Sequence, residues 1–335
     1  MLERGESLSL KNYNTFGIDC SAQEVLLLEH TDQLKEIKNL NEVFILGGGS
    51  NVLFTADLNK RVLINQSKGI TEIQKGDEVA LHIASGEVWH DVVEYAVSKN
   101  YGGIENLSLI PGSVGAAPMQ NIGAYGVEIK DVLEYVDVID LKSLEKKRFT
   151  KEECEFAYRE SVFKKKFKGK YFIAAIGIIL TTNNHELNTS YGAIQDELDQ
   201  LGIVDPSVRD VSEAVIRIRK SKLPDPQDLG NAGSFFKNPV IDIAHFNALK
   251  EKFPNIKNYP VSESKTKVPA GWLIESLGWK GKRIGNTGSH EKQALVLVNY
   301  GSATGSEVKE LSDQIRKSVM EKYMIRLETE VNIIS

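Results

Sequence analysis

The chain has 335 residues, of which 41% are hydrophobic, and a formal net charge of −5. This length allows two or three domains, because a single core stops growing near about 250–300 residues. The acidic balance gives no reason to expect binding to nucleic acid or to an anionic membrane surface. No apolar run approaches the roughly 18 residues that span a bilayer.

The terminal and cysteine patterns narrow the class of protein further. The first segment, MLERGESLSL, lacks the apolar core of a secretion signal, so we expect a cytoplasmic protein without membrane insertion. Cys20 and Cys154 show no C-x-x-C spacing, and the six histidines show no H-x-x-x-H spacing. The sequence therefore predicts neither a disulfide framework nor a metal site. It makes no prediction about oligomeric state.

Strand-like and helix-like segments alternate along the chain and predict an α+β protein. Three segments have apolar residues at helical spacing, at 31–39, 88–99 and 208–219. Near the end, Thr304 and Glu307 form a capping-box pattern before a long amphipathic helix, and a closing strand is expected around 328–334. Short β-branched segments predict strands at 42–46, 61–64, 79–83, 136–141, 171–180 and 293–299.

Two stretches between these elements predict boundaries or loops. The segment KLPDPQDLGNAG (222–233) carries two prolines and two glycines and is typical of a boundary or an active-site loop. A second boundary is expected near residues 66–69. The lysine run FKKKFKGK (163–170) could bind phosphate or nucleic acid, but its alternating phenylalanines favour a half-buried edge with a solvated face.

The first glycine-rich loop, GGGSNV (47–52), follows a predicted strand. Val52 stands where the dinucleotide fingerprint G-x-G-x-x-G needs its third glycine, and no Lys-Ser/Thr follows as a P-loop requires. Bare N–H groups with the side chains of Ser50 and Asn51 suit a pyrophosphate. A plain turn is an equally good interpretation of this loop alone.

The second glycine-rich loop spans residues 110–126 (IPGSVGAAPMQNIGAYG) and contains four glycines, two prolines and three alanines. Such small side chains let a backbone approach a flat ligand closely, while amides offer hydrogen bonds to heteroatoms. The mixture suits an isoalloxazine ring. A tight crossing between domains is the alternative.

Several longer motifs occur together with these loops. They are NTFG (14–17), GGGSNVL (47–53), ENLSLIPGSVGAAPMQNIGAYGVE (105–128), YRES (158–161), KLPDP (222–226), NAGSFFKNP (231–239), AGWLIE (270–275) and LETEV (327–331). In this order they resemble the UDP-N-acetylenolpyruvoylglucosamine reductase family, and the resemblance runs nearly end to end.

The resemblance implies a two-subdomain FAD-binding unit of the vanillyl-alcohol-oxidase type with a C-terminal α+β substrate-binding domain. The expected boundaries are 1–68 for the first subdomain, 69–207 with the strand 326–335 for the second, and 208–325 for the substrate domain. Non-covalent FAD, NADPH as hydride donor and a nucleotide-sugar substrate in peptidoglycan precursor synthesis are also implied. No His or Cys lies in the two loops, which argues against a covalent flavin link.

The family motifs carry site residues onto this chain. The implied cofactor-binding residues are Gly47, Gly48, Gly49, Ser50, Asn51, Pro111, Gly112, Ser113, Gly115, Ala116, Asn121, Gly123, Ala124 and Tyr125. The implied substrate-binding residues are Tyr191, Arg219, Lys222, Asn238 and Gln293. Tyr191 matches a loop tyrosine of the longer, type I branch, and Gly192 offers that loop a hinge.

The implied catalytic residues are Arg159, Ser234 and Glu330. Hydride delivery to an enolpyruvyl group leaves negative charge beside its carboxylate, which a planar guanidinium such as Arg159 can stabilise. Ser234 would then donate a proton to carbon, and Glu330 would complete the enolate-stabilising pair with a raised pKa.

Each of these residues also has a structural interpretation. Arg159 could form a surface ion pair, Ser234 could be a turn serine, and Glu330 could face solvent. Period-two alternation places Glu328 and Glu330 on one face, so the sequence alone does not choose between them. The basic cluster at 219–222 could simply decorate a helix C-terminus.

Two other functions stay open at this point. One is a flavin oxidase of the same fold, which would need a base for an alcohol proton and access for oxygen. The other is a nucleotide-sugar binding protein without chemistry. The segment 284–290 (IGNTGSH) departs from the family pattern, so no contact is carried over to it.

Overall fold

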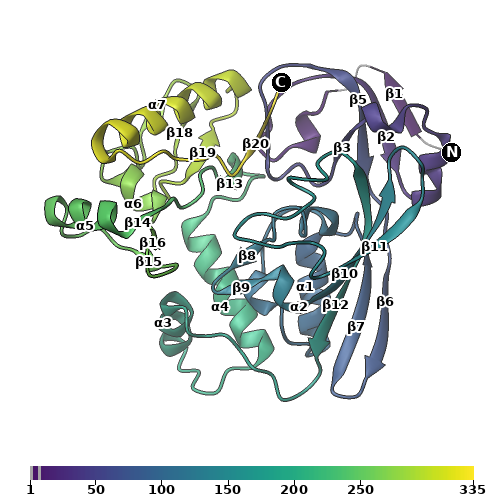
Figure 1. Cartoon of the computed structure of the whole chain (residues 1–335), viewed down its shortest axis with the longest axis horizontal. Coiled ribbons are helices and arrows are strands. Elements are labelled where there is room, and N and C mark those ends of the chain that lie inside the picture. Colours follow the sequence, from purple (N-terminus) through teal and green to yellow (C-terminus); the bar gives the residue numbers. More distant parts are fainter. Residues whose placement is uncertain (1–2, 7–8) are drawn as a thin grey trace. The chain divides into compact units, whose positions relative to one another are not determined.

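A computed structural model describes residues 3–6 and 9–335 of the chain, and Figure 1 shows its elements. These residues divide into two compact units. Unit 1 holds residues 22–48 and 59–220 together with the described N-terminal residues, and unit 2 holds residues 9–21, 49–58 and 221–335. The predicted α+β class is confirmed. The division into three domains stays a prediction.

Unit 1 contains two main sheets and four α-helices. The helices are α1 (Trp89–Ser98), α2 (Ile129–Val132), α3 (Gly192–Gln200) and α4 (Val208–Lys222), the last of which continues two residues beyond it. The four-stranded sheet has the order β1 (Glu3–Glu6), β2 (Ala22–Leu28), β5 (Leu58–Asn65) and β3 (Phe44–Leu46). The five-stranded sheet has the order β11 (Lys146–Thr150), β10 (Leu133–Asp140), β12 (Tyr171–Thr181), β7 (Glu78–Ala84) and β6 (Ile70–Lys75), and β8 (Gly123–Ala124) pairs with β9 (Val127–Glu128).

Three strands of the four-stranded sheet run parallel. β3 pairs in parallel with β5 over residues 44–46 and 62–64. The N–H of Gln66 donates to the carbonyl of Leu28, and the N–H of Leu58 donates to that of Ser21, so β2 also runs parallel to β5. Ligands of open α/β sheets bind beyond the carboxyl ends of such strands. The glycine loop after β3 and the residues after β2 and β5 share this edge.

The five-stranded sheet is covered on one face by the core of unit 1. Val79, Leu81 and Ile83 of β7 alternate into a buried cluster with Val136 and Val138 of β10. Val114 and Ala117 of the second glycine loop belong to the same cluster. The loop is therefore fixed to this face, and the intervening residues of β7 point to the opposite one.

Unit 2 is built from short strands and three α-helices. α7 (Gly305–Tyr323) begins at the N-cap Thr304, whose hydroxyl accepts from the N–H of Glu307, so the predicted capping box is confirmed. None of the described helices is long and apolar enough to cross a membrane. The other elements are β13 (Gly230–Ser234), β19 (Val296–Asn299), β18 (Thr287–Ser289), β17 (Arg283–Ile284), β14 (Val240–Asp242), β16 (Lys265–Lys267), β15 (Tyr259–Pro260), β4 (Val52–Phe54), β20 (Asn332–Ile334), α5 (Ile243–Lys252) and α6 (Ala270–Glu275).

Three predicted elements differ from the structure. Residues 31–39 form only a 3₁₀ helix over Thr31–Glu36, because the backbone of Ile37, at the C-cap, is already extended (φ −94°, ψ 113°). The strand expected at 293–299 begins at Val296, since a turn bond joins its N–H to the carbonyl of Gln293. The closing strand is regular only over Asn332–Ile334, after an isolated bridge between Thr329 and Phe236.

Both cysteines are buried and reduced, Cys20 in unit 2 and Cys154 in unit 1. Burial raises the pKa of Cys20 to about 11 and that of Cys154 to about 12. Because the thiolate is the reactive form, we expect neither thiol of the folded protein to react with a disulfide reagent at pH 8. The measurement is the absorbance of the released thiol before and after adding urea. Rapid reaction of a thiol in the folded protein would contradict this burial.

Candidate active site

The two glycine-rich loops meet within unit 1. A Cβ atom on Gly48 would lie 2.9 Å from the Cα of Gly112, and one on Gly47 would lie 2.3 Å from the Oγ of Ser113. Real Cβ atoms do not approach backbone atoms this closely, so the contact requires glycine at position 48. The sequence suggested that small residues let a ligand approach the backbone closely. In the structure, the glycines at 47 and 48 let the two loops approach each other.

This junction presents several main-chain donors. Among the residues that the structure describes, the N–H groups of Gly47, Gly48, Gly112 and Ser113 donate no hydrogen bond to protein. By contrast, the N–H groups of Val114 and Gly115 bind the carbonyls of Glu87 and Ser85. Neighbouring N–H groups without a protein acceptor attract an anion, and a pyrophosphate is an anion. The donor set of this junction therefore fits the diphosphate of a dinucleotide cofactor.

The second loop contains two non-glycine residues in the left-handed region, Asn121 (φ 46°) and Tyr125 (φ 49°). Asn121 is fully buried, and its amide donates to the carboxylate of Glu128 and to the carbonyl of Ala157. Strained backbone of this kind persists where the surroundings hold it, and it concentrates at functional sites. Asn121 thus fixes the shape of the loop, a role that its sequence context did not indicate.

Arg159 lies against this loop. Its backbone is also left-handed (φ 56°), within the turn made by mutual hydrogen bonds of Ala157 and Glu160. The guanidinium donates to the carbonyl of Gly123 at 2.8 Å. A surface ion pair, the structural interpretation of this arginine, does not describe these contacts. The structure places a partly buried cation beside the predicted flavin loop.

Arg219 of α4 holds the start of the same loop. Its Nε donates to the carbonyl of Leu109 at 3.2 Å, and its side chain hydrogen-bonds Tyr125. Burial lowers the pKa of Arg219, Tyr125 opposes this, and the charge of Arg159 lowers it further. Two guanidinium groups thus influence each other within unit 1, and an anion between them would relieve their repulsion.

The N–H of Leu109 is held from the other side, by the Nδ1 of His90 at 3.0 Å. Leu109 is itself left-handed (φ 56°), so both of its main-chain groups are tied to side chains. This bond needs His90 unprotonated at Nδ1. Burial is the largest effect and lowers the pKa of His90. Glu94 and then Asp91 oppose it, and Arg219 and Lys220 lower the pKa by smaller amounts.

We expect part of the stability to be lost as the pH falls below the ordinary histidine value of about 6.5. Below this pH the unfolded chain binds a proton at His90 that the folded protein does not bind. The contribution of His90 to the free energy of unfolding is therefore fully present above this pH and declines below it. The check is the urea midpoint of unfolding between pH 7.5 and pH 5.5. The His90→Asn variant should show a shallower decline, and an equal decline would exclude His90 as a source.

Ser234 ends β13 in unit 2. A bulge precedes it, where Gly233 is left-handed (φ 67°) and its N–H donates to the side chain of Asn231. Phe235 and Phe236, which follow, are fully buried. A bulge of this type aims the side chain beside it away from the regular ladder. Ser234 is therefore placed by a local device and remains partly accessible.

Glu330 lies on the segment next to Ser234. Its N–H donates to the carbonyl of Phe235 at 2.8 Å, and Thr329 bridges to Phe236. The structure also separates the two acids of this segment. The side chain of Glu328 is 72% exposed and lies 3.6 Å from the ammonium group of Lys237, while Glu330 is partly buried. Unit 2 thus brings Ser234 and Glu330 together, and Arg159 belongs to unit 1.

The predicted substrate residues are distributed over both units. Tyr191 packs edge-to-face on Tyr125, with ring centroids 5.3 Å apart, and is 46% exposed. In unit 2, Asn238 accepts from the N–H of Ala270 at the start of α6. Gln293 lies on the turn before β19, and Lys222 is exposed. Their roles toward a substrate stay predictions.

Comparison with known proteins identifies the family. Residues 225–334 match the profile of the UDP-N-acetylenolpyruvoylglucosamine reductase C-terminal domain, and residues 22–143 match an FAD-binding domain. A UDP-N-acetylenolpyruvoylglucosamine reductase from Flavobacterium johnsoniae is 50% identical, over 99% of this chain and 100% of its own length. The chain belongs to this reductase family. Reductases of the same name from Pseudomonas fluorescens and Amoebophilus asiaticus are 45% and 44% identical, each over at least 97% of both chains.

A solved structure of a reductase of this family has the same fold as this chain. The crystal structure of the reductase from Thermus caldophilus matches with a TM-score of 0.69 at 24% identity, covering 100% of this chain and 99% of that one. The predicted fold and the recognition of the family from sequence are confirmed. FAD is the cofactor of the domain at residues 22–143, which contains both glycine-rich loops.

Proposed function

We propose that this chain reduces UDP-N-acetylenolpyruvoylglucosamine to UDP-N-acetylmuramate, with NADPH as the hydride donor, in the cytoplasmic synthesis of peptidoglycan precursors. The observation that carries the proposal is end-to-end identity of 50% to a reductase of that name. The donor groups at the loop junction support it, because a reductase of this kind needs a bed for a dinucleotide.

FAD would be held non-covalently at the junction of the loops. The N–H groups of Gly47, Gly48, Gly112 and Ser113 would bind its diphosphate, with Gly49, Ser50 and Asn51 completing the first loop. The small residues Gly115, Ala116, Gly123 and Ala124, with Pro111, Asn121 and Tyr125, would line its rings. When bound, FAD supplies a hydride that it has received from NADPH.

The protein's own side chains would control charge and protonation on the substrate. Arg159 would stabilise the negative charge that develops beside the substrate carboxylate, because a guanidinium fork matches a carboxylate and keeps its charge. Glu330, in protonated form, would donate a hydrogen bond to the same carboxylate. Ser234 would pass its hydroxyl proton to the carbon that carries the charge, and solvent would restore it.

The nucleotide part of the substrate would be held away from the reacting atoms. Lys222 would neutralise the diphosphate, and Asn238 and Gln293 would bind polar groups of the sugar and nucleotide. Tyr191 would close over the substrate by rotation of its loop at Gly192, where a Cβ would meet no atom within 4 Å. Arg219 would also bind the substrate. Its hydrogen bonds to Leu109 and Tyr125 would in addition position the second glycine-rich loop.

The experiment is product analysis with the purified, FAD-loaded protein. Incubation with NADPH and UDP-N-acetylenolpyruvoylglucosamine should give one product that has gained two hydrogen atoms, identified by mass spectrometry. Omitting NADPH or the nucleotide sugar should abolish it. Oxidation of an alcohol or sugar at the expense of oxygen, with no reduction of the enolpyruvyl group, would contradict the proposal and favour an oxidase.

A further inference from the structure

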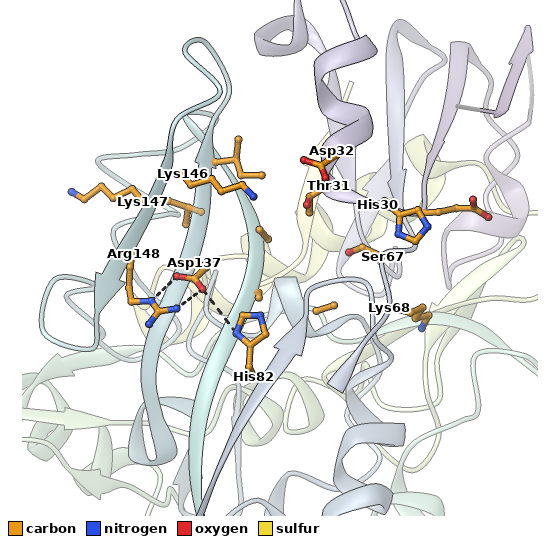
Figure 2. A pocket seen from close by; sticks show the side chains of 16 residues that line it. His30, Thr31, Asp32, Ser67, Lys68, His82, Asp137, Lys146, Lys147 and Arg148 are labelled. Carbon is orange, nitrogen blue, oxygen red and sulfur yellow. Dashed lines mark hydrogen bonds and ion pairs between the residues drawn. The ribbon is translucent and has the colours of Figure 1, made fainter. Parts of the chain in front are cut away.

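Unit 1 has a pocket that neither the flavin loops nor the predicted site residues use. Its volume is about 620 Å³, within the usual range of small-ligand sites. Figure 2 shows its two walls, with His30, Thr31, Asp32, Ser67 and Lys68 on one and the strands of the five-stranded sheet on the other. The first wall follows the carboxyl ends of the parallel strands β2 and β5. This is the sheet edge where open α/β folds bind ligands.

The pocket and the flavin loops lie on opposite faces of the five-stranded sheet. Ala84 and Ala175 are direct partners across β7 and β12, and Ala175 is also the partner of Asp137 on β10. These three residues line the pocket, whereas the alternate residues of the same strands enter the core that contains Val114 of the second loop. The pocket is therefore a place separate from the flavin bed.

The sheet side of the pocket carries a network of paired polar side chains. Arg148 makes two hydrogen bonds of 2.7 Å to Asp137 and stacks 3.5 Å from the ring of Tyr135. His82 lies 3.1 Å from the hydroxyl of Tyr135. It also lies 3.9 Å from Asp137, and Figure 2 shows this contact. These contacts hold Arg148 and His82 in defined positions, so a ligand would meet groups that have already lost part of their conformational freedom.

Lys146 supplies a further positive charge at the pocket. Among the described residues it has no carboxylate within ion-pair distance, and Figure 2 shows its side chain directed into the pocket while that of Lys147 extends away. In a chain of net charge −5, such a cation beside Arg148 and His82 favours an anionic ligand.

The opposite wall has a different chemistry. Glu29, Asp32, Thr31 and Ser67 offer oxygen atoms that accept hydrogen bonds, as ribose hydroxyls and exocyclic amino groups require. Ala84, Ala174 and Ala175 also line the pocket, and their small side chains leave room for a planar ring. A ligand with one anionic end and a flat, hydrogen-bond-donating body matches both walls.

We propose that this pocket binds a nucleoside phosphate, with the phosphate against Lys146 and His82 and the nucleoside against the wall that follows β2 and β5. The site is additional to the flavin and nucleotide-sugar sites and does not depend on the reaction that they perform. A nucleoside diphosphate such as ADP is a suitable probe, because its negative charge and its hydrogen-bond donors are at opposite ends of the molecule.

The test uses the FAD-loaded protein, with flavin absorbance confirming that the probe displaces no FAD. ADP binding is measured by calorimetry and located by amide hydrogen exchange, with pyrophosphate as the second arm. We expect ADP to protect residues 30–32, 67–68 and 146–148 and pyrophosphate to bind more weakly. Lys146→Glu should weaken ADP binding about tenfold or more, because a charge-assisted contact becomes a repulsion.

Lys166→Glu is the matched control. It makes the same change of net charge on a lysine that stacks on Phe167 and does not line the pocket, so it should bind ADP as the unchanged protein does. Thermal unfolding checks that both variants fold. Protection confined to other residues, equal affinity of the two lysine variants, or equal binding of ADP and pyrophosphate would overturn the assignment.

Discussion

Replacing Ser234 by alanine should leave reduction of the flavin by NADPH unchanged and slow reoxidation by the enolpyruvyl substrate by about 10²–10⁴-fold, the range of a lost general acid. The proposed proton transfer belongs only to the second half-reaction, because only the substrate accepts the proton at carbon. Stopped-flow absorbance of the flavin band without oxygen measures each half-reaction separately.

The control is Ser302→Ala, the same chemical change at an exposed turn of unit 2. It should leave both half-reactions as they are. Since Ser234 lies between a bulge and two buried phenylalanines, thermal unfolding of Ser234→Ala must also match the unchanged protein. If the variant slows both half-reactions to a similar extent, Ser234 acts through structure and the proton-donor role is wrong.

Gly48→Ala should weaken FAD binding about 10- to 100-fold. The new Cβ would lie 2.9 Å from the Cα of Gly112 and 3.3 Å from the N of Ser113, and both are backbone atoms that no side-chain rotation removes. The loops must move apart to remove this clash, which costs about 1–3 kcal/mol. The movement would separate the N–H groups at the junction, and a loss of this size corresponds to the stated fall in FAD affinity. Flavin retained after dialysis and the Kd from fluorescence titration measure the loss.

Two further substitutions test the geometric reason. Gly192→Ala places a Cβ where nothing lies within 4 Å, so it should retain FAD. A Cβ on Gly47 would clash mainly with the Oγ of Ser113, which lies at 2.3 Å, while the Cβ of Ser113 is 3.5 Å away. The pair Gly47→Ala with Ser113→Ala should therefore bind FAD better than Gly47→Ala alone. Full retention of FAD by Gly48→Ala would refute the close contact of the loops.

The sequence predicted helices correctly where a local pattern, such as apolar periodicity or a capping box, marked residues that the fold buries or caps. The helix expected over 208–219 is α4, and its periodic residues Val208, Val211, Val215 and Ile218 are all buried. The capping box at Thr304 starts α7 as expected. The glycine loops were correctly assigned to an FAD-binding domain, because long motifs in register are far more specific than one loop.

The sequence could not predict features that arise from tertiary contacts. Left-handed backbone at Leu109, Asn121 and Arg159 has no local signal, because these are not glycines and neighbouring groups hold them in place. The bond of Arg219 to the carbonyl of Leu109 joins residues 110 positions apart, so a basic cluster at a helix end gave no hint of it. Likewise, Lys237 distinguishes Glu328 from Glu330, which alternation alone could not.

We propose that the loop junction holds a flavin that receives hydride from NADPH and gives it to the nucleotide sugar. The most direct test of this proposal is the flavin absorbance of the purified protein, followed without oxygen. NADPH should bleach the flavin band, and UDP-N-acetylenolpyruvoylglucosamine should then restore it in a one-to-one amount. A protein that takes up no FAD, or a bleached flavin that recovers only when oxygen is admitted, would contradict the account.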